Sequence, residues 1–443
     1  MEVPSGVYRQ RNPKSTPWYR CVEDHFDEFT RGYDERFGHK YGFWRPHIEK
    51  IIFEFLDCGD LKQGFARVRC GECDKEFLVA FSCKRRHFCP SCHAKRVVEF
   101  GEFLRASVLE QVPHRHVVFS LPKFLRRYFL YNRKLLGGLS RCAWKCLKLF
   151  LAAACPGETI PGAVVSIQTF GDLLTFHPHL HILVTDGAFQ SDREFIRAPL
   201  FDPDRLEELF RQKVFYLLLT EGRLTRELVE MHSTWRHSGF HVFCGEAIAP
   251  EDETARENIA RYIVRASMSQ ERLTYLENEG KVVYQTKEGT VKKEFPAIEW
   301  MAATCSHIPN PGEHMVRYYG FYSNAARGKR GKKEDGNLLI VRKPLFKKRD
   351  FRLNWARLIK KIYEADPMRC PKCGGAMRII AFIEQAPVIE KILRHLGLWE
   401  TPSRAPPRKE VTREDTDEDE FIQHDQPFPE FYPDPEYSWT DYS

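Results

Sequence analysis

The chain has 443 residues, of which 42% are hydrophobic and 29% are charged, a composition that excludes wholesale disorder and collagen-like repeats. No apolar run reaches the roughly 20 residues of a membrane span, and the polar N-terminus lacks the apolar segment of a signal peptide, so a cytoplasmic protein without membrane contact is expected. Residues 1–400 hold 64 Lys and Arg against 49 Asp and Glu, whereas residues 401–443 hold 4 against 12. A basic body of this kind points to a polyanionic partner, most often nucleic acid.

The predicted organisation has five regions. In chain order they are an N-terminal helical region (1–64), a zinc-binding domain (65–110), a core of strands and helices (111–276), a basic C-terminal region (277–400) and a disordered acidic tail (401–443). In the core, β-branched and aromatic residues predict strands over Arg115–Pro122, Ala163–Phe170 and His179–Gly187. Helices are expected over about 125–154, as a pair over 204–238, over 250–276 and near 352–365. Glycines and a single charge sign predict a mobile, solvated segment over Arg327–Lys333.

The zinc-binding domain is predicted from paired cysteines. Fourteen cysteines in a cytoplasmic protein favour metal binding over disulfides. Two Cys-x-x-Cys pairs lie fifteen residues apart, the spacing of a zinc ribbon, and we expect their thiolates to form one closed tetrahedral site: Cys70, Cys73, Cys89 and Cys92. A closed site is structural, and here the metal would stand in for a hydrophobic core. Cys83, His87 and His93 are alternative ligands, and the basic side chains nearby are either DNA contacts or a solvated face.

A third Cys-x-x-Cys pair, Cys370-Pro-Lys-Cys373, forms a turn of the kind called a knuckle. It is half of a metal site, because no second pair follows it. Its partner is left open: it could recruit Cys305 or a histidine such as His395, pair across a dimer, or bind no metal.

Alternating histidines mark a second candidate metal centre. In an extended strand His179 and His181 share one face, and two imidazoles on one face can hold a divalent ion while leaving positions open for substrate. Gln168 on the preceding predicted strand is the preferred third ligand, since antiparallel pairing would bring it beside the histidines. His177 is its rival, although Pro178 places it at the edge of the strand.

A family resemblance rests on several of these motifs together. A His-hydrophobe-His strand preceded by VVFSLP resembles the HUH single-strand endonucleases. FGDLLTFHPHLHILVTDGAF is similar to the rolling-circle transposases of the insertion sequence 91 family, and CKRRHFCPSCHAKR resembles their N-terminal zinc-binding domain. The segments His314–Lys329 and Trp355–Ile383 resemble the C-terminal half of that family. The resemblance covers about residues 20–395 and implies an α+β fold, in which a small zinc-ribbon module precedes an HUH-type nuclease core of mainly antiparallel sheet and flanking helices.

The resemblance also implies a catalytic tyrosine on a helix after the histidine strand. Tyr262 fits, beside the apolar stripe of a helix expected over Asn258–Leu273, with Arg261 and Arg265 placed to bind phosphate. Residue 266 is alanine, so the arrangement resembles the single-tyrosine members of the family. The alternative role of Tyr262 is packing, and the rival nucleophiles are Tyr275, Tyr318 and Tyr319.

The function implied is a DNA transposase that nicks and joins single-stranded DNA at the ends of its own element. It would act by rolling-circle transposition through a 5′-phosphotyrosine, with catalytic Mg²⁺ or Mn²⁺, structural Zn²⁺ and no nucleotide cofactor. Its DNA partner would be single-stranded, with terminal hairpins of the element. Mixed basic and aromatic segments predict further DNA contacts at Arg126, Arg127, Arg317, Arg327 and Lys329.

Three alternatives remain at this point. A replication initiator or relaxase would use the same residues at an origin. A non-catalytic zinc DNA-binding regulator would need the cysteines but not the histidines or Tyr262. A metal hydrolase would turn over without a covalent adduct.

Overall fold

The computed structural model describes residues 13–333, apart from residues 86, 156, 191–193, 199–200, 288 and 290, together with residues 369–399. The predicted acidic tail and the helix expected near 352–365 lie outside the described residues.

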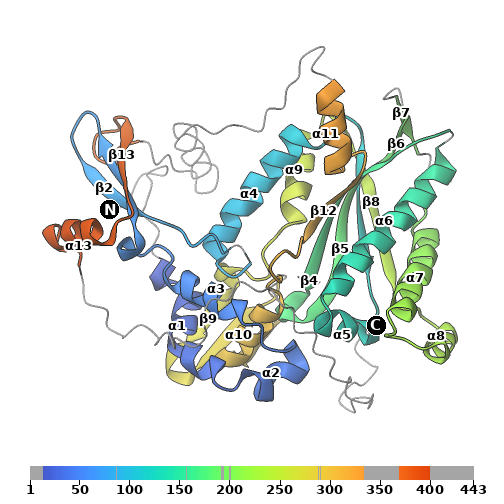
Figure 1. Ribbon diagram of the computed structural model, residues 1–443, viewed down its shortest axis with the longest axis horizontal. Coiled ribbons are helices and arrows are strands. Elements are labelled where there is room, and N and C mark those ends of the chain that lie inside the picture. The colour runs from blue at the N-terminus through green and yellow to red at the C-terminus, as the bar shows by residue number, and fades with distance from the viewer. Residues whose placement is uncertain are drawn as a thin grey trace. The chain divides into compact units, whose positions relative to one another are not determined.

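A five-stranded antiparallel sheet forms the centre of the predicted core (Figure 1). Its strands lie in the order β12 (Val316–Gly320), β4 (Gly162–Phe170), β5 (Phe176–Thr185), β3 (His114–Ser120) and β8 (His241–Ile248). The three predicted strands are confirmed as β3, β4 and β5, and the histidine strand β5 is central. The predicted end of the core at residue 276 is wrong, because β12 pairs with β4 and completes the same sheet.

Helices cover both faces of this sheet (Figure 1). One face packs against α5 (Lys123–Tyr131), α6 (Lys134–Ala154) and α7 (Pro203–Thr220), with α8 (Arg226–Ser233) following. Alternate residues of the strands enter this core, among them Val117, Phe119, Val165, Ile167, Leu180 and Ile182. The predicted helix over 125–154 is therefore two helices, separated at Asn132, whose backbone leaves the helical region at φ −130° and ψ 84°.

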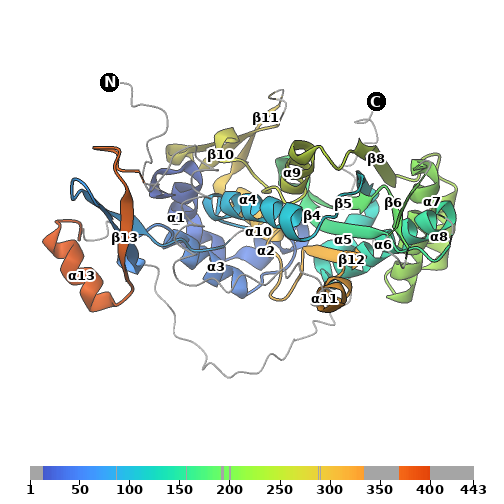
Figure 2. The ribbon, with the colours of Figure 1, turned by 90° about the horizontal axis from the view of Figure 1, so that it is seen from above.

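The opposite face is covered by α4 (Pro90–Ser107) and α9 (Glu253–Tyr262), which lie side by side (Figures 1 and 2). Their apolar residues meet Val164 and Leu183 of the sheet in a smaller core with Phe100, Leu104, Ala260, Ile263 and Tyr322. Side chains alternate between the two faces of a strand. The polar residues that lie two or four positions from Val164 along β4, or from Leu183 along β5, therefore also point toward these two helices.

A second core joins the N-terminal helices to a distant part of the chain. The helices α1 (Pro17–Thr30), α2 (Tyr33–Tyr41) and α3 (His47–Leu56) pack with a small sheet, of order β11 (Lys292–Pro296), β10 (Lys281–Gln285) and β9 (Leu273–Leu276), and with α10 (Ala297–Ser306). Trp18 and Trp300 are fully buried there. The start of the predicted C-terminal region thus belongs structurally with the N-terminal helices.

A third sheet carries the zinc-binding hairpin, in the order β13 (Met377–Ile383), β1 (Phe65–Cys70) and β2 (Glu76–Ala80). The strand β13 is antiparallel to β1, with Met377 opposite Cys70, and α13 (Ala386–His395) packs beside it through Ile389 and Leu393. A short hairpin, β6 (Gly187–Phe189) with β7 (Phe195–Arg197), follows β5.

Two predicted segments differ from the structure. The helix expected over 250–276 ends at Tyr262, because the carbonyls of Ile263 and Val264 accept hydrogen bonds from side chains of other elements. The segment expected to be mobile over Arg327–Lys333 belongs to α11 (Asn324–Lys333), where the Ser323 hydroxyl accepts from the Ala326 amide at the first turn. With these corrections the α+β class is confirmed.

Candidate active site and metal centres

The histidine strand and its neighbour place four polar side chains on the face covered by α4 and α9. In the ladder of β4 and β5, Gln168 lies opposite His179, and Ser166 lies opposite His181. All are buried, with exposed fractions of 3% for Gln168, 8% for His179 and 4% for His181. The antiparallel pairing therefore brings the expected third ligand beside the histidine pair.

Hydrogen bonding fixes the protonation of His179. Its Nδ1 lies 2.7 Å from the carbonyl oxygen of His177, and a carbonyl only accepts, so Nδ1 carries the proton and Nε2 keeps a lone pair. Burial lowers the pKa of His179 to about 4 and that of His181 to about 2. Both rings are neutral near pH 7, which is the form that ligates metal.

His116 of β3 is a site residue that the sequence did not single out. Its Nε2 shares a 3.0 Å hydrogen bond with Nδ1 of His181, and the two rings stack with centroids 5.2 Å apart. Burial lowers the pKa of His116 to about 4. The strand prediction over Arg115–Pro122 contained this residue, but nothing local showed which of its two faces would meet the histidine pair.

Several buried atoms at this site have no hydrogen-bond partner among the described residues. They include Nε2 of His181, Nε2 of His177 and Oε1 of Gln168. An unsatisfied buried polar atom costs about 1–3 kcal/mol, so such atoms call for a ligand. A divalent cation fits this donor set of two neutral imidazoles and an amide oxygen. His177 keeps its place as a rival third ligand, since its ring centroid lies 5.1 Å from that of His179.

Tyr262, the last residue of α9, stands beside these histidines. Its ring is edge-on to His181, with centroids 5.3 Å apart, and to His116 at 6.0 Å. The side chain is 38% exposed, so a substrate can reach it. The guanidinium of Arg265 lies over the Tyr262 ring at 5.0 Å and over Phe170 at 5.7 Å, and it has no acidic partner among the described residues.

The rival tyrosines have other partners. The hydroxyl of Tyr275 donates to Asp24 at 2.8 Å in the N-terminal core. Tyr319 stacks on Trp144 of α6, on the face of the sheet opposite the histidines. Tyr318 lies under Arg327. Among the described tyrosines, Tyr262 is the one whose ring meets the histidines of β5.

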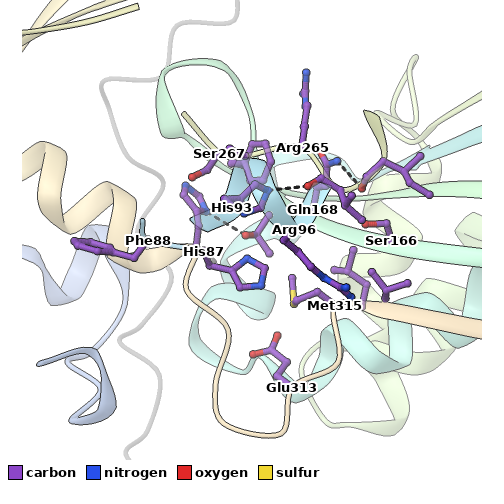
Figure 3. Close-up of a pocket in the computed structure, with 18 of the residues that line it drawn as sticks. His87, Phe88, His93, Arg96, Ser166, Gln168, Arg265, Ser267, Glu313 and Met315 are labelled. Atoms are coloured by element: carbon purple, nitrogen blue, oxygen red, sulfur yellow. Dashed lines mark hydrogen bonds between the residues drawn. The ribbon is translucent and has the colours of Figure 1, made fainter. Parts of the chain in front are cut away.

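The loop after Tyr262 is anchored from two sides. The Gln168 amide donates to the carbonyl of Ile263 at 3.0 Å, and Nε2 of His93, from α4, donates to the carbonyl of Val264 at 2.8 Å. Between these anchors lies a cavity of about 300 Å³ whose walls include Gln168, Arg265 and His93 (Figure 3). The position of Tyr262 thus depends on both a candidate metal ligand and the zinc-binding domain.

The cysteines form two clusters of four rather than the single site that was predicted. One cluster is Cys58, Cys83, Cys89 and Cys92, and the other is Cys70, Cys73, Cys370 and Cys373. Within each cluster all ligand atoms lie within 4.8 Å of one another. The predicted site of Cys70, Cys73, Cys89 and Cys92 is wrong. The first pair lies at the turn of the hairpin of β1 and β2, whereas the second pair lies at the start of α4, beyond the end of that hairpin.

The predicted DNA-contact residues are scattered around the sheet. Arg261 forms an ion pair with Glu257 on α9, at 2.6 Å, whereas Arg265 faces Tyr262. Arg126 of α5 lowers the pKa of both His177 and His179 by its charge, in addition to the larger effect of burial, so it lies on the site's side of the molecule. Arg127, on the same helix, is half-buried.

The C-terminal candidates divide between the two faces. Arg317 lies on the face of β12 opposite the histidines, where its side chain approaches Gly137 of α6. Arg327 lies over the rings of Phe103 and Tyr318, and Lys329 is exposed on α11. No helix in the described part of the chain combines the length and apolar character needed to cross a membrane.

Two family models match separate parts of the chain. Residues 24–121 match a family model described as "Transposase zinc-binding domain", and residues 162–330 match one described as "Putative transposase". The first range contains the whole Cys58 cluster, and the second contains the histidine strand, Tyr262 and β12. No solved structure matches the chain.

Two curated relatives are also described as transposases. The "Transposase for insertion sequence element IS801" of Pseudomonas savastanoi pv. phaseolicola is 26% identical over 354 residues, which are 75% of this chain and 83% of that protein. The "Putative transposase y4qJ" of Sinorhizobium fredii (strain NBRC 101917 / NGR234) is 29% identical over 282 residues, 58% of this chain and 70% of that protein. With a zinc-binding domain and a transposase domain in this order, the chain belongs to the insertion sequence 91 family of transposases and acts on DNA.

Proposed function

We propose that this transposase nicks and joins single-stranded DNA at the ends of its own element by rolling-circle transposition, with Tyr262 as the nucleophile. The observation that carries the proposal is the contact of the Tyr262 ring with His181 and His116, beside Arg265, which has no acidic partner among the residues that the structure describes. An exposed tyrosine, neutral imidazoles and a free guanidinium together suit attack on a phosphodiester.

The residues fit a catalytic Mg²⁺ or Mn²⁺. Nε2 of His179 has a lone pair, and Nε2 of His181 and Oε1 of Gln168 are buried without hydrogen-bond partners in the described part of the chain. Imidazole ligands favour Mn²⁺ over Mg²⁺ by affinity, whereas cellular abundance favours Mg²⁺. When bound, such an ion supplies polarisation of the scissile phosphate and stabilises the charge that builds on its oxygens.

The remaining steps belong to the side chains. Arg265 holds a non-bridging phosphate oxygen, since a guanidinium can donate two parallel hydrogen bonds to phosphate. The Tyr262 hydroxyl loses its proton to solvent and its oxygen bonds to phosphorus, while the bond from phosphorus to the 3′ oxygen breaks and that oxygen takes up a proton. The products are a 5′-phosphotyrosine and a free 3′-hydroxyl.

Joining is the same step in reverse. Because the phosphoester bond energy is kept in the link to Tyr262, a 3′-hydroxyl from another junction can attack it and release the tyrosine. No nucleotide cofactor is needed. The single tyrosine at this position favours sequential cleavage and joining over a mechanism with two simultaneous phosphotyrosines.

The test uses single-stranded oligonucleotides tiled across both flanks of the element, with the full-length protein and Mn²⁺. We expect a protein–DNA adduct on a denaturing gel that carries the 3′-terminal label of the substrate, and a released fragment whose 3′ end a polymerase can extend. Tyr262→Phe should abolish the adduct, whereas the matched control Tyr275→Phe should keep it.

Other outcomes would favour other functions. Cleavage without an adduct would favour a metal hydrolase, and binding without cleavage would favour a zinc-dependent DNA-binding regulator. Adducts formed at a replication origin but not at the element's flanks would favour a replication initiator or relaxase. The transposase relatives and the zinc-binding domain support cleavage at the element's ends.

A further inference from the structure

The knuckle at Cys370 meets a partner almost 300 residues away. The Sγ atoms of Cys70 and Cys373 lie 3.5 Å apart, and those of Cys73 and Cys370 lie 3.6 Å apart. Cys70 and Cys73 stand at the turn of the hairpin of β1 and β2, and Cys370 and Cys373 immediately precede β13, which pairs with β1. Both family models end before residue 369.

The two knuckles have the same local structure. The amide of the first cysteine donates to the carbonyl five residues on, from Cys70 to Lys75 and from Cys370 to Gly375, each at 2.9 Å. In each knuckle an amide two residues after the first cysteine donates to its sulfur at 3.4 Å. Donors aimed at sulfur stabilise the thiolate, which is the form that ligates metal.

The residue after each second cysteine adopts a left-handed conformation. Asp74 has φ 57° and Gly374 has φ 75°. Aspartate and glycine both tolerate this conformation, and the Asp74 carboxylate also accepts two hydrogen bonds from Arg69, at 3.1 and 2.8 Å. Two segments far apart in sequence therefore form one matching pair of cysteine-bearing turns.

The sulfur geometry fits one tetrahedral ion. Four sulfurs at about 2.3 Å from a central Zn²⁺ are separated by about 3.8 Å along the edges of the tetrahedron. The distances of 3.5 and 3.6 Å agree with this value, and they exceed the about 2.05 Å of a disulfide bond. The Cys58 cluster, which lies within the matched zinc-binding domain, shows comparable separations of 3.6 to 4.0 Å.

We propose that Cys70, Cys73, Cys370 and Cys373 bind a second Zn²⁺ that clamps the C-terminal segment, residues 369–399, onto the zinc-binding domain of the same chain. The domain is thus discontinuous, because one of its two metal sites is completed from beyond the nuclease core. The apolar cluster around this site is small, with Ala66, Val68, Met377 and Ile379 as its main members besides cysteines, so the metal takes the place of a larger core.

The clamp also protects a sheet edge. With β13 in place, β1 is the central strand of its sheet, and the backbone of β1 is paired on both sides. Without the metal, β13 is held by its strand pairing, by the small apolar cluster of Met377 and Ile379 with β1, and by the contacts of α13. The inference does not depend on the role of Tyr262.

Metal content of the full-length protein tests the clamp. Mass spectrometry of the intact monomer, together with elemental analysis, should find two zinc ions per chain. Cys370→Ser with Cys373→Ser should leave one, Cys70→Ser with Cys73→Ser should leave one, and all four together should still leave one. The control Cys244→Ser, outside both clusters, should keep two.

A different stoichiometry would overturn the inference. Two zinc ions retained by the Cys370→Ser, Cys373→Ser variant would show that the knuckle is not a ligand pair. A four-fold variant that loses more zinc than either pair would show two independent sites. Two zinc ions found in a dimer but not in a monomer would show that the site forms between chains.

A cleavage assay covers the case in which these variants fold poorly. A protease site inserted between Lys333 and Arg369 allows the folded full-length protein to be cut. The C-terminal fragment should co-elute with the rest of the chain until a zinc chelator is added. Separation of the fragments before chelation, in protein that contains two zinc ions, would refute the clamp.

Discussion

His116→Ala is expected to weaken the binding of the catalytic metal without removing a ligand. The change deletes the 3.0 Å hydrogen bond to His181 and leaves Nδ1 of that buried ring without a partner. An unsatisfied buried group costs about 1–3 kcal/mol, and about 1.4 kcal/mol corresponds to a factor of ten in binding. We therefore expect the dissociation constant for Mn²⁺ to rise about 10- to 100-fold, as for other partners of metal-binding histidines.

The assay for this prediction is direct. Electron paramagnetic resonance of free Mn²⁺, recorded during titration of the full-length protein, gives the dissociation constant without any DNA. His116→Gln is the matched variant, because its amide oxygen can still accept a hydrogen bond from Nδ1 of His181, which carries the proton when Nε2 binds metal, and it should restore most of the affinity. His241→Ala, an exposed change on the neighbouring strand β8, is the control for general damage to the sheet.

The reasoning would be refuted if His116→Ala bound Mn²⁺ as tightly as the unaltered protein while His179→Ala lost binding. That pair of results would mean that the orientation of His181 does not depend on His116. Equal losses in His116→Ala and His241→Ala would instead trace the effect to the fold.

Three further predictions concern stability and the site. Burial lowers the pKa values of the His114 and His307 rings to about 3, so below pH 6.5 the unfolded chain binds protons that the folded chain cannot. The free energy of unfolding should therefore fall by about 2 kcal/mol per ring between pH 7 and pH 5. Urea titrations at both pH values measure this, and equal stabilities would contradict it. Arg265→Ala should slow cleavage about 100-fold, and Arg265→Lys should recover part of the rate, because a lysine keeps the charge but not the planar guanidinium. Gel kinetics at low salt measure these rates, and an unchanged rate in Arg265→Ala would exclude a contact between Arg265 and phosphate. Gln168→Ala should raise the Mn²⁺ concentration needed for cleavage, whereas the same change at His177 should not; the opposite pattern would make His177 the third ligand.

Local patterns were sufficient to predict the centre of the sheet and its histidine face. Strand alternation is a short-range property, so the sharing of one face by His179 and His181, and the place of Gln168 opposite His179, follow from sequence once the strands are paired. The candidate nucleophile came from the family resemblance, and its helix could be located because α9 has an apolar stripe.

What sequence reasoning missed depends on contacts between distant segments. Their spacing in sequence led to the prediction that the first two cysteine pairs share one metal site. In the structure the hairpin of β1 and β2 separates these two pairs and brings Cys70 close to Cys373. The helix after residue 250 was predicted too long, since hydrogen bonds from Gln168 and His93 end it at Tyr262. The edge strand β12 is short, and its residues lie about 150 positions along the chain from their partners in β4, so no local signal tied it to the core.

The most direct test of the catalytic account is the site of covalent attachment. The protein–DNA adduct formed with Mn²⁺ would be digested with protease and nuclease, and tandem mass spectrometry would locate the modified residue. The account predicts a nucleotide linked through phosphate to the oxygen of Tyr262, in protein that loses the adduct when His179 and His181 are replaced by alanine. A nucleotide on Tyr318 or another residue, or an adduct formed equally well without those histidines, would contradict it.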